Sequence, residues 1–125
     1  MRSSATIAFF FLCISTVLIT QSCHHAPTIP DKQVSFSADI VPIMGGNCQA
    51  SGCHGLNDGE FPLVTYEDLV KHGRIVPFKP YQSSIYQTVV SRQPGYVMPV
   101  PPAAPLTETQ IETLFIWIEQ GALNN

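Results

Sequence analysis

The chain has 125 residues, with six basic and nine acidic side chains and a net charge of −3. It contains no cluster of basic residues, which argues against nucleic acid as a partner. Its eleven prolines and eight glycines favour short elements joined by loops within one small domain. A domain of this kind buries little apolar surface, so we expect something other than the polypeptide to complete its core.

The N-terminus predicts export. Residues 7–19, IAFFFLCISTVLI, form a nearly continuous apolar run behind the positive charge of Arg2. Such a run fits the hydrophobic region of a signal peptide and is short for a bilayer-spanning helix. The next segment, ITQSC, resembles a bacterial lipobox, although Thr20 stands where leucine is usual. We predict a lipoprotein-type signal peptide over residues 1–22 and lipidation at Cys23; ordinary cleavage nearby is the alternative.

This signal predicts a protein in the periplasm or on the outer face of a bacterial membrane. Acyl chains on Cys23 would hold it at the membrane surface without a spanning segment. Residues 23–34 are polar and contain two prolines, so they are interpreted as a tether. Residues 35–125 are predicted to form the folded domain.

The first helix is predicted over residues 36–44, FSADIVPIM. Ser37 is a possible N-cap, and Gly45-Gly46 a possible end. Pro42 lies inside the pattern, so the helix is either short or begins close to this proline. The apolar side chains at helical spacing are Phe36, Ile40, Ile43 and Met44.

Two short helices are predicted next. Residues 65–73 begin with Thr65, carry Asp68 three positions later and end in glycine, as a capped helix does. Residues 83–91, SSIYQTVVS, are also predicted to form a short capped helix, with Ser83 or Ser84 as the N-cap.

The last helix has the clearest pattern. It opens with Thr107, places Gln110 at the capping-box position and stops at Gly121. The segments between the helices are interpreted as loops, and residues 97–105 as an extended, proline-rich one. The apolar face of the last helix comprises Ile111, Leu114, Phe115 and Ile118, widened by Ile116 and by Trp117, a core residue.

The stretch GNCQASGCHG, residues 46–55, carries the most specific chemistry. A disulfide between Cys48 and Cys53 suits an exported protein, but it closes a short loop and leaves His54 without a role. A zinc site would need a further ligand, and adjacent cysteine and histidine side chains rarely reach one small ion together. The available candidates for that ligand are His24, His25 and His72.

Covalent haem attachment accounts for all three residues. Two thiols add across the vinyl groups, and a histidine directly after the second thiol becomes the proximal iron ligand. The usual motif has two residues between the cysteines, whereas QASG separates them here, so the spacer must bulge outward. Small side chains and the permissive backbone of Gly52 allow this. We predict one haem c bound through Cys48 and Cys53, with His54 as proximal ligand.

Three residues are candidates for the sixth iron ligand. Met98 lies in the stiff proline-rich segment before the last helix, where its sulfur can be presented with little loss of entropy. Met44 is too near Cys48 and is better interpreted as core. His72, in the last turn of a helix, would give bis-histidine iron of lower potential. Met98 is predicted, with His72 as the alternative.

The order of these motifs resembles a small monohaem c-type cytochrome domain of bacterial exported lipoproteins. The resemblance covers residues 36–122, and its most specific parts are Cys53-His54, Met98-Pro99 and the closing WIEQGA. It implies an all-α, cytochrome c-like fold, with about four short helices and long loops around one covalently bound haem. It also implies that both cysteines bind haem, that His54 is proximal and that Met98 is distal. The four-residue spacer departs from the family pattern at Cys48.

The resemblance and the ligand set imply one-electron transfer between Fe(III) and Fe(II) and no enzymatic activity, either alone or as the redox subunit of a larger oxidoreductase. The expected partners are redox proteins of the respiratory or periplasmic chain and the membrane surface; no nucleic acid and no small-molecule substrate are expected. The alternative is a disulfide-stapled periplasmic binding or structural lipoprotein without haem. Residues expected to surround the haem are Phe61, Tyr81 and Tyr96, with Arg74, Lys79 and Arg92 as candidate partners of its propionates.

Overall fold

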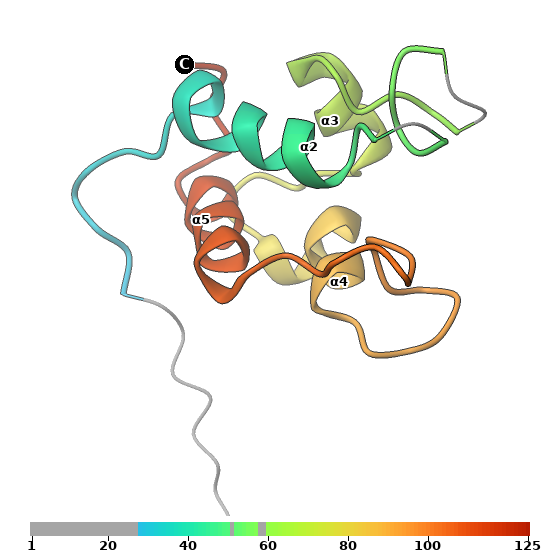
Figure 1. Ribbon diagram of the computed structural model, residues 1–125. Helices are drawn as coiled ribbons and strands as arrows, with labels where there is room; N and C mark the ends of the chain where they lie inside the picture. The colour runs from blue at the N-terminus through green and yellow to red at the C-terminus, as the bar shows by residue number, and fades with distance from the viewer. Residues whose placement is uncertain (1–27, 51, 58–59) are drawn as a thin grey trace, which may run out of the picture.

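A computed structural model describes residues 28–50, 52–57 and 60–125 (Figure 1). The predicted signal peptide, residues 1–22, and the predicted lipidation site, Cys23, lie outside the described residues. The described part of the chain is all-α, with four α-helices and no strands, which confirms the predicted class. None of the helices described there is long and apolar enough to cross a membrane.

The first predicted helix forms as two consecutive pieces, a π-helical turn η1 (Phe36–Ile40) and α2 (Val41–Asn47). Pro42 lies in the first turn of α2, where the missing proline N–H would have no helical partner in any case. The prediction that a helix begins close to this proline is therefore confirmed for α2.

Both predicted ends of this segment were wrong. The N-cap of η1 is Ser35, whose hydroxyl accepts a hydrogen bond from the Ala38 N–H at 3.2 Å, while the Ser37 hydroxyl donates to the Asn125 carbonyl at 2.9 Å. Helix α2 runs through both glycines to Asn47, whose side-chain amide donates to the Ile43 carbonyl at 2.8 Å. Burial of Ile43 and of the neighbouring methionine outweighs the low helix propensity of glycine.

The middle helices are α3 (Tyr66–His72) and α4 (Ser84–Val90), with a 3-10 turn η2 (Pro80–Gln82) between them. The predicted cap at Thr65 is confirmed and takes the form of a capping box, because Thr65 and Asp68 each accept the other's backbone N–H at 3.1 Å. The N-cap of α4 is Ser83, but its hydroxyl does not cap the helix. It is buried and instead accepts from the Val76 N–H at 2.9 Å, which ties the preceding loop to α4.

Helix α5 (Glu108–Glu119) forms the centre of the core. Its predicted capping box between Thr107 and Gln110 is present, with hydrogen bonds of 3.2 and 2.8 Å. Its residues 114–118 are all buried, as predicted, and Trp117 donates its indole N–H to the Leu123 carbonyl at 3.0 Å. Phe36 of η1 packs against the Trp117 ring at a centroid distance of 5.8 Å, so the first and last helical segments are joined through the core.

Two long loops lie on one side of the helices. Figure 1 shows the loop that follows α2 and the loop between α4 and α5 extending from the same side of the molecule, beyond α3 and α4. The loop between α4 and α5 is held to α4, because the Met98 N–H donates to the Thr88 carbonyl at 3.1 Å. The Ile85 N–H donates to the Gly73 carbonyl at 2.9 Å, which joins α4 to the end of α3.

Candidate functional site

A cavity of about 540 Å³ lies between α3, α4 and these two loops. Its volume falls within the roughly 300–1,000 Å³ of typical ligand and cofactor sites. Three of the four predicted haem-binding residues line it: Cys48, His54 and Met98. Cys53 is also described but is not among the lining residues. The structure thus brings together residues from the end of α2, the following loop and the segment before α5.

Cys48 and His54 are joined through their backbones. Cys48 is the C-cap of α2, and its N–H donates to the Met44 carbonyl at 2.8 Å. The His54 N–H in turn donates to the Cys48 carbonyl at 3.0 Å, which returns the histidine to the point where the loop began. Gly52 has φ +81°, a conformation that favours glycine. The hydrogen bond between the two backbones therefore keeps His54 beside Cys48.

The imidazole of His54 has a defined orientation. Its Nδ1 lies 2.9 Å from the backbone carbonyl oxygen of Phe61. A carbonyl oxygen can only accept, so Nδ1 carries a hydrogen, and in the neutral imidazole the lone pair is then on Nε2. Metal-binding histidines are commonly fixed in this way, since the bond sets the tautomer and raises the basicity of the other nitrogen. His54 is thus prepared to bind a metal through Nε2.

Hydrogen bonds also hold the loop that contains Phe61. The Leu63 N–H donates to the His54 carbonyl at 2.9 Å, and the Gln49 side-chain amide donates to the Leu63 carbonyl at 2.7 Å. These two bonds connect Leu63, near the end of the loop between α2 and α3, to Gln49 and His54 nearer its beginning. The orientation of His54 therefore depends on hydrogen bonds at both its backbone and its ring.

His72, the alternative sixth ligand, lines the same cavity. The Phe61 ring stacks on His72 at a centroid distance of 5.0 Å and contacts the His54 ring at 4.6 Å. The two imidazoles and Phe61 thus form one continuous group of rings. Met98 instead belongs to the segment bonded to Thr88 of α4. His54 and Met98 consequently belong to different parts of the cavity lining.

The apolar and charged lining of the cavity was only partly predicted. Phe61 and Tyr96 line it, as does Arg74, whereas Tyr81 and Lys79 line a different hollow. Lys71 is a lining residue that sequence reasoning missed. A lysine in the last turn of a helix is ordinarily explained by the helix dipole, so its position in the sequence gave little sign of a role in a site. Further lining residues that the sequence did not single out are Leu63, Ile85 and Val89.

The two cysteines of the motif are free thiols in the structure, each half-buried. Burial raises the pKa of the Cys48 thiol to about 11, and the neighbouring Cys53 adds to this increase. The Cys48 side chain is therefore a neutral thiol at pH 7, as expected for a sulfur in an apolar cavity wall. Among the described residues, no group of three or more His, Cys, Asp or Glu side chains is placed to hold a metal ion; His24 and His25 lie outside them.

Comparisons with protein families, with curated proteins and with solved structures found no match to this chain.

Proposed function

We propose that the protein is an electron carrier with a cytochrome c-like fold that binds one haem c through Cys48 and Cys53. In this proposal His54 is the proximal iron ligand and Met98 the sixth ligand. The observation that carries it is the convergence of Cys48, His54 and Met98 on one cavity from separate parts of the chain. No enzymatic activity is proposed for the chain, which acts alone or as a redox subunit of a larger oxidoreductase.

The chemistry of the cavity supports this cofactor over a smaller one. Leu63, Ile85 and Val89 are buried and line it, which suits the apolar face of a porphyrin. Lys71 and Arg74 supply positive charge at the same cavity, and such side chains pair well with carboxylates such as the haem propionates. The volume of about 540 Å³ is much larger than a metal ion needs.

The residues of the chain would control how the cofactor behaves. When bound, haem supplies one-electron exchange between ferric and ferrous iron. His54 would hold the iron through Nε2 while its Nδ1–H stays bonded to the Phe61 carbonyl, so no proton needs to move at this ligand. The thioether of Met98 would raise the potential relative to a second histidine. With His54 and Met98 both bound to the iron, the chain would leave no position there for a substrate.

We further propose that the protein is exported and anchored to a membrane through acylated Cys23. An anchored carrier of this kind would meet redox partners of the respiratory or periplasmic chain at or near the membrane surface. Nucleic acid and small-molecule substrates have no place in this proposal.

The test is an absorption spectrum of protein made in a host with cytochrome-maturation machinery. The purified protein should be red, and its alkaline pyridine haemochrome should have the band positions of a haem with two thioether bonds. Cys48→Ser and Cys53→Ser should each shift the band toward that of a haem with one thioether. Colourless protein in which Cys48 and Cys53 resist alkylation until reduced would instead favour the disulfide-stapled module and overturn the proposal.

A further inference from the structure

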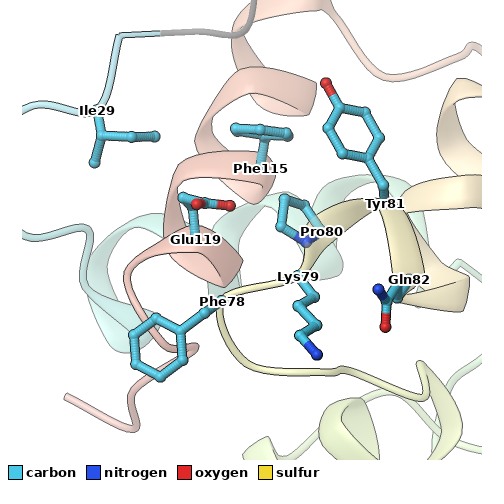
Figure 2. A pocket seen from close by; sticks show the side chains of 8 residues that line it. All are labelled: Ile29, Phe78, Lys79, Pro80, Tyr81, Gln82, Phe115 and Glu119. Atoms are coloured by element: carbon cyan, nitrogen blue, oxygen red, sulfur yellow. The ribbon is translucent and has the colours of Figure 1, made fainter.

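A second hollow, of about 350 Å³, lies on another face of the molecule. Figure 2 shows the side chains around it: Phe115 and Glu119 come from α5, Tyr81 and Gln82 from η2, and Ile29 from the segment that precedes η1. None of the residues that line this hollow also lines the larger cavity. Whatever occupies this hollow would therefore leave the proposed haem site accessible.

The rim of this hollow exposes large apolar side chains. Phe78 is 65% exposed, Tyr81 is 61% exposed and Ile29 is 40% exposed. Exposed apolar side chains that gather around one hollow, unlike single scattered ones, are typical of an interaction surface. We call Ile29, Phe78 and Tyr81, with Lys79 among them, the Phe78 face.

Phe78 is held in its exposed position by the fold. Its φ is +63°, in the left-handed region that bulky residues rarely adopt. Its N–H donates to the Ile118 carbonyl at 2.8 Å, which fixes the backbone to the end of α5. The ring lies over Gly121, where an added Cβ would come within 2.8 Å of it. A rare backbone conformation is thus retained at a residue whose ring faces solvent.

The chain that leads to the predicted lipidation site leaves the domain at this same face. The side-chain amide of Gln120 donates to the carbonyls of Pro30 and Lys32, at 3.2 and 3.1 Å, and accepts from the Val34 N–H at 2.8 Å. The later part of the predicted tether is therefore bound at the C-terminal end of α5. Only residues 24–28 separate Cys23 from Ile29, so even a fully extended chain spans about 20 Å between them.

We infer that the Phe78 face rests on the surface of the lipid bilayer. Aromatic rings favour the interface between headgroups and acyl chains, and lysine places its ammonium group among the phosphates while its stem covers apolar surface. A short anchor makes this contact intramolecular, so even a weak contact is well populated. Because Glu119 lies at the same hollow and the chain is acidic overall, we expect the contact to form on zwitterionic lipid without anionic headgroups. The inference rests on the proposed acylation of Cys23 and not on the haem.

The test uses mature, acylated protein with one environment-sensitive fluorophore, at Gln82→Cys beside the hollow or at Leu56→Cys as control. Leu56 is 74% exposed and lies in the loop that follows α2. On phosphatidylcholine vesicles, the emission of the label at position 82 should rise about twofold or more as the label leaves water. Spin-labelled lipid should then quench it. The label at position 56 should respond to neither.

Two variants connect the response to the rings themselves. Phe78→Asn with Tyr81→Ser should abolish the rise at position 82, and asparagine tolerates the left-handed backbone. The matched control Val100→Ser, which removes an exposed apolar side chain from the loop before α5, should leave the response intact. The far-UV spectrum and the haem spectrum report that each variant is folded.

Three results would overturn the inference. An acylated protein whose label at position 82 does not change on vesicles has no such contact. A response that appears in detergent without vesicles and grows with protein concentration means that two copies pair through this face. A mass spectrum without acyl chains at Cys23 removes the anchor on which the inference rests, while leaving the haem proposal unaffected.

Discussion

If the domain binds haem as proposed, loss of the haem should remove most of its stability. The perturbation is the double variant Cys48→Ser, Cys53→Ser, which cannot form thioether bonds, purified without the cofactor. The space that haem would fill has a volume of about 540 Å³. At about 24 cal/mol for each Å³ of unfilled core, it corresponds to an upper limit of about 13 kcal/mol. The value is a limit because the cavity opens to solvent and its walls can partly close.

That limit is as large as the entire stability of a typical domain, about 5–15 kcal/mol. We therefore expect the haem-free variant to be largely unfolded, with a weak far-UV helical signal and no cooperative thermal transition. The assay is far-UV circular dichroism against temperature and urea. The control is Cys23→Ser, which removes a thiol outside the domain and should retain the transition. A haem-free variant that melts cooperatively at the midpoint of the wild-type holoprotein would refute the reasoning.

Three further predictions concern the ligands, the core and pH. Met98→Ala should lower the reduction potential and let cyanide bind the iron, whereas His72→Ala should leave the axial-ligand spectrum unchanged. Leu114→Ala, at a fully buried position of α5, should lower the free energy of unfolding of the holoprotein by about 2–5 kcal/mol in urea titrations. Hydrogen bonds from the backbone and hydroxyl of Thr65 lower the pKa of the Asp68 carboxyl group below 3.8. The ionised carboxylate therefore stabilises the fold above pH 3.8, and this stabilisation is lost as the pH falls through the lowered pKa. Asp68→Asn should therefore reduce the acid dependence of stability in that range.

Each of these predictions has a contrary outcome. If His72→Ala changes the spectrum and Met98→Ala does not, the sixth ligand is His72. For the core, Glu112→Ala on the exposed side of α5 is the control and should change stability by less than about 0.5 kcal/mol; equal losses for both variants would contradict the proposed packing. An Asp68→Asn protein with the acid dependence of the wild type would show that the capping box does not carry this effect.

Local signals made much of the fold predictable. The capping boxes at Thr65 and Thr107 each depend on two residues three positions apart in the sequence, and both form. The apolar face of α5 follows directly from its spacing. The errors occurred where distant residues decide: Ser37 has cap chemistry, but its hydroxyl bonds to Asn125, which local sequence does not reveal. Likewise Gly45 stays helical because its neighbours are buried.

The candidate site likewise contains some residues that the sequence could predict and some interactions that it could not. Cys48 and His54 are identified by a contiguous motif, and Met98 by its proline-rich setting, so sequence reasoning could single them out. The carbonyl of Phe61 that orients His54 is a backbone group and leaves no mark in the residue type. The role of Gln120 in holding residues 30–34 at the C-terminal end of α5 is equally long-range, and only the fold brings these groups together.

The most direct measurement is the intact mass of the mature protein under denaturing conditions, after its expression with cytochrome-maturation machinery. The account predicts a mass equal to that of the polypeptide and its modification at Cys23 plus one haem, with the added haem located by proteolysis on the peptide that contains Cys48 and Cys53. A polypeptide mass without haem, in protein that carries a Cys48–Cys53 disulfide, would contradict the account.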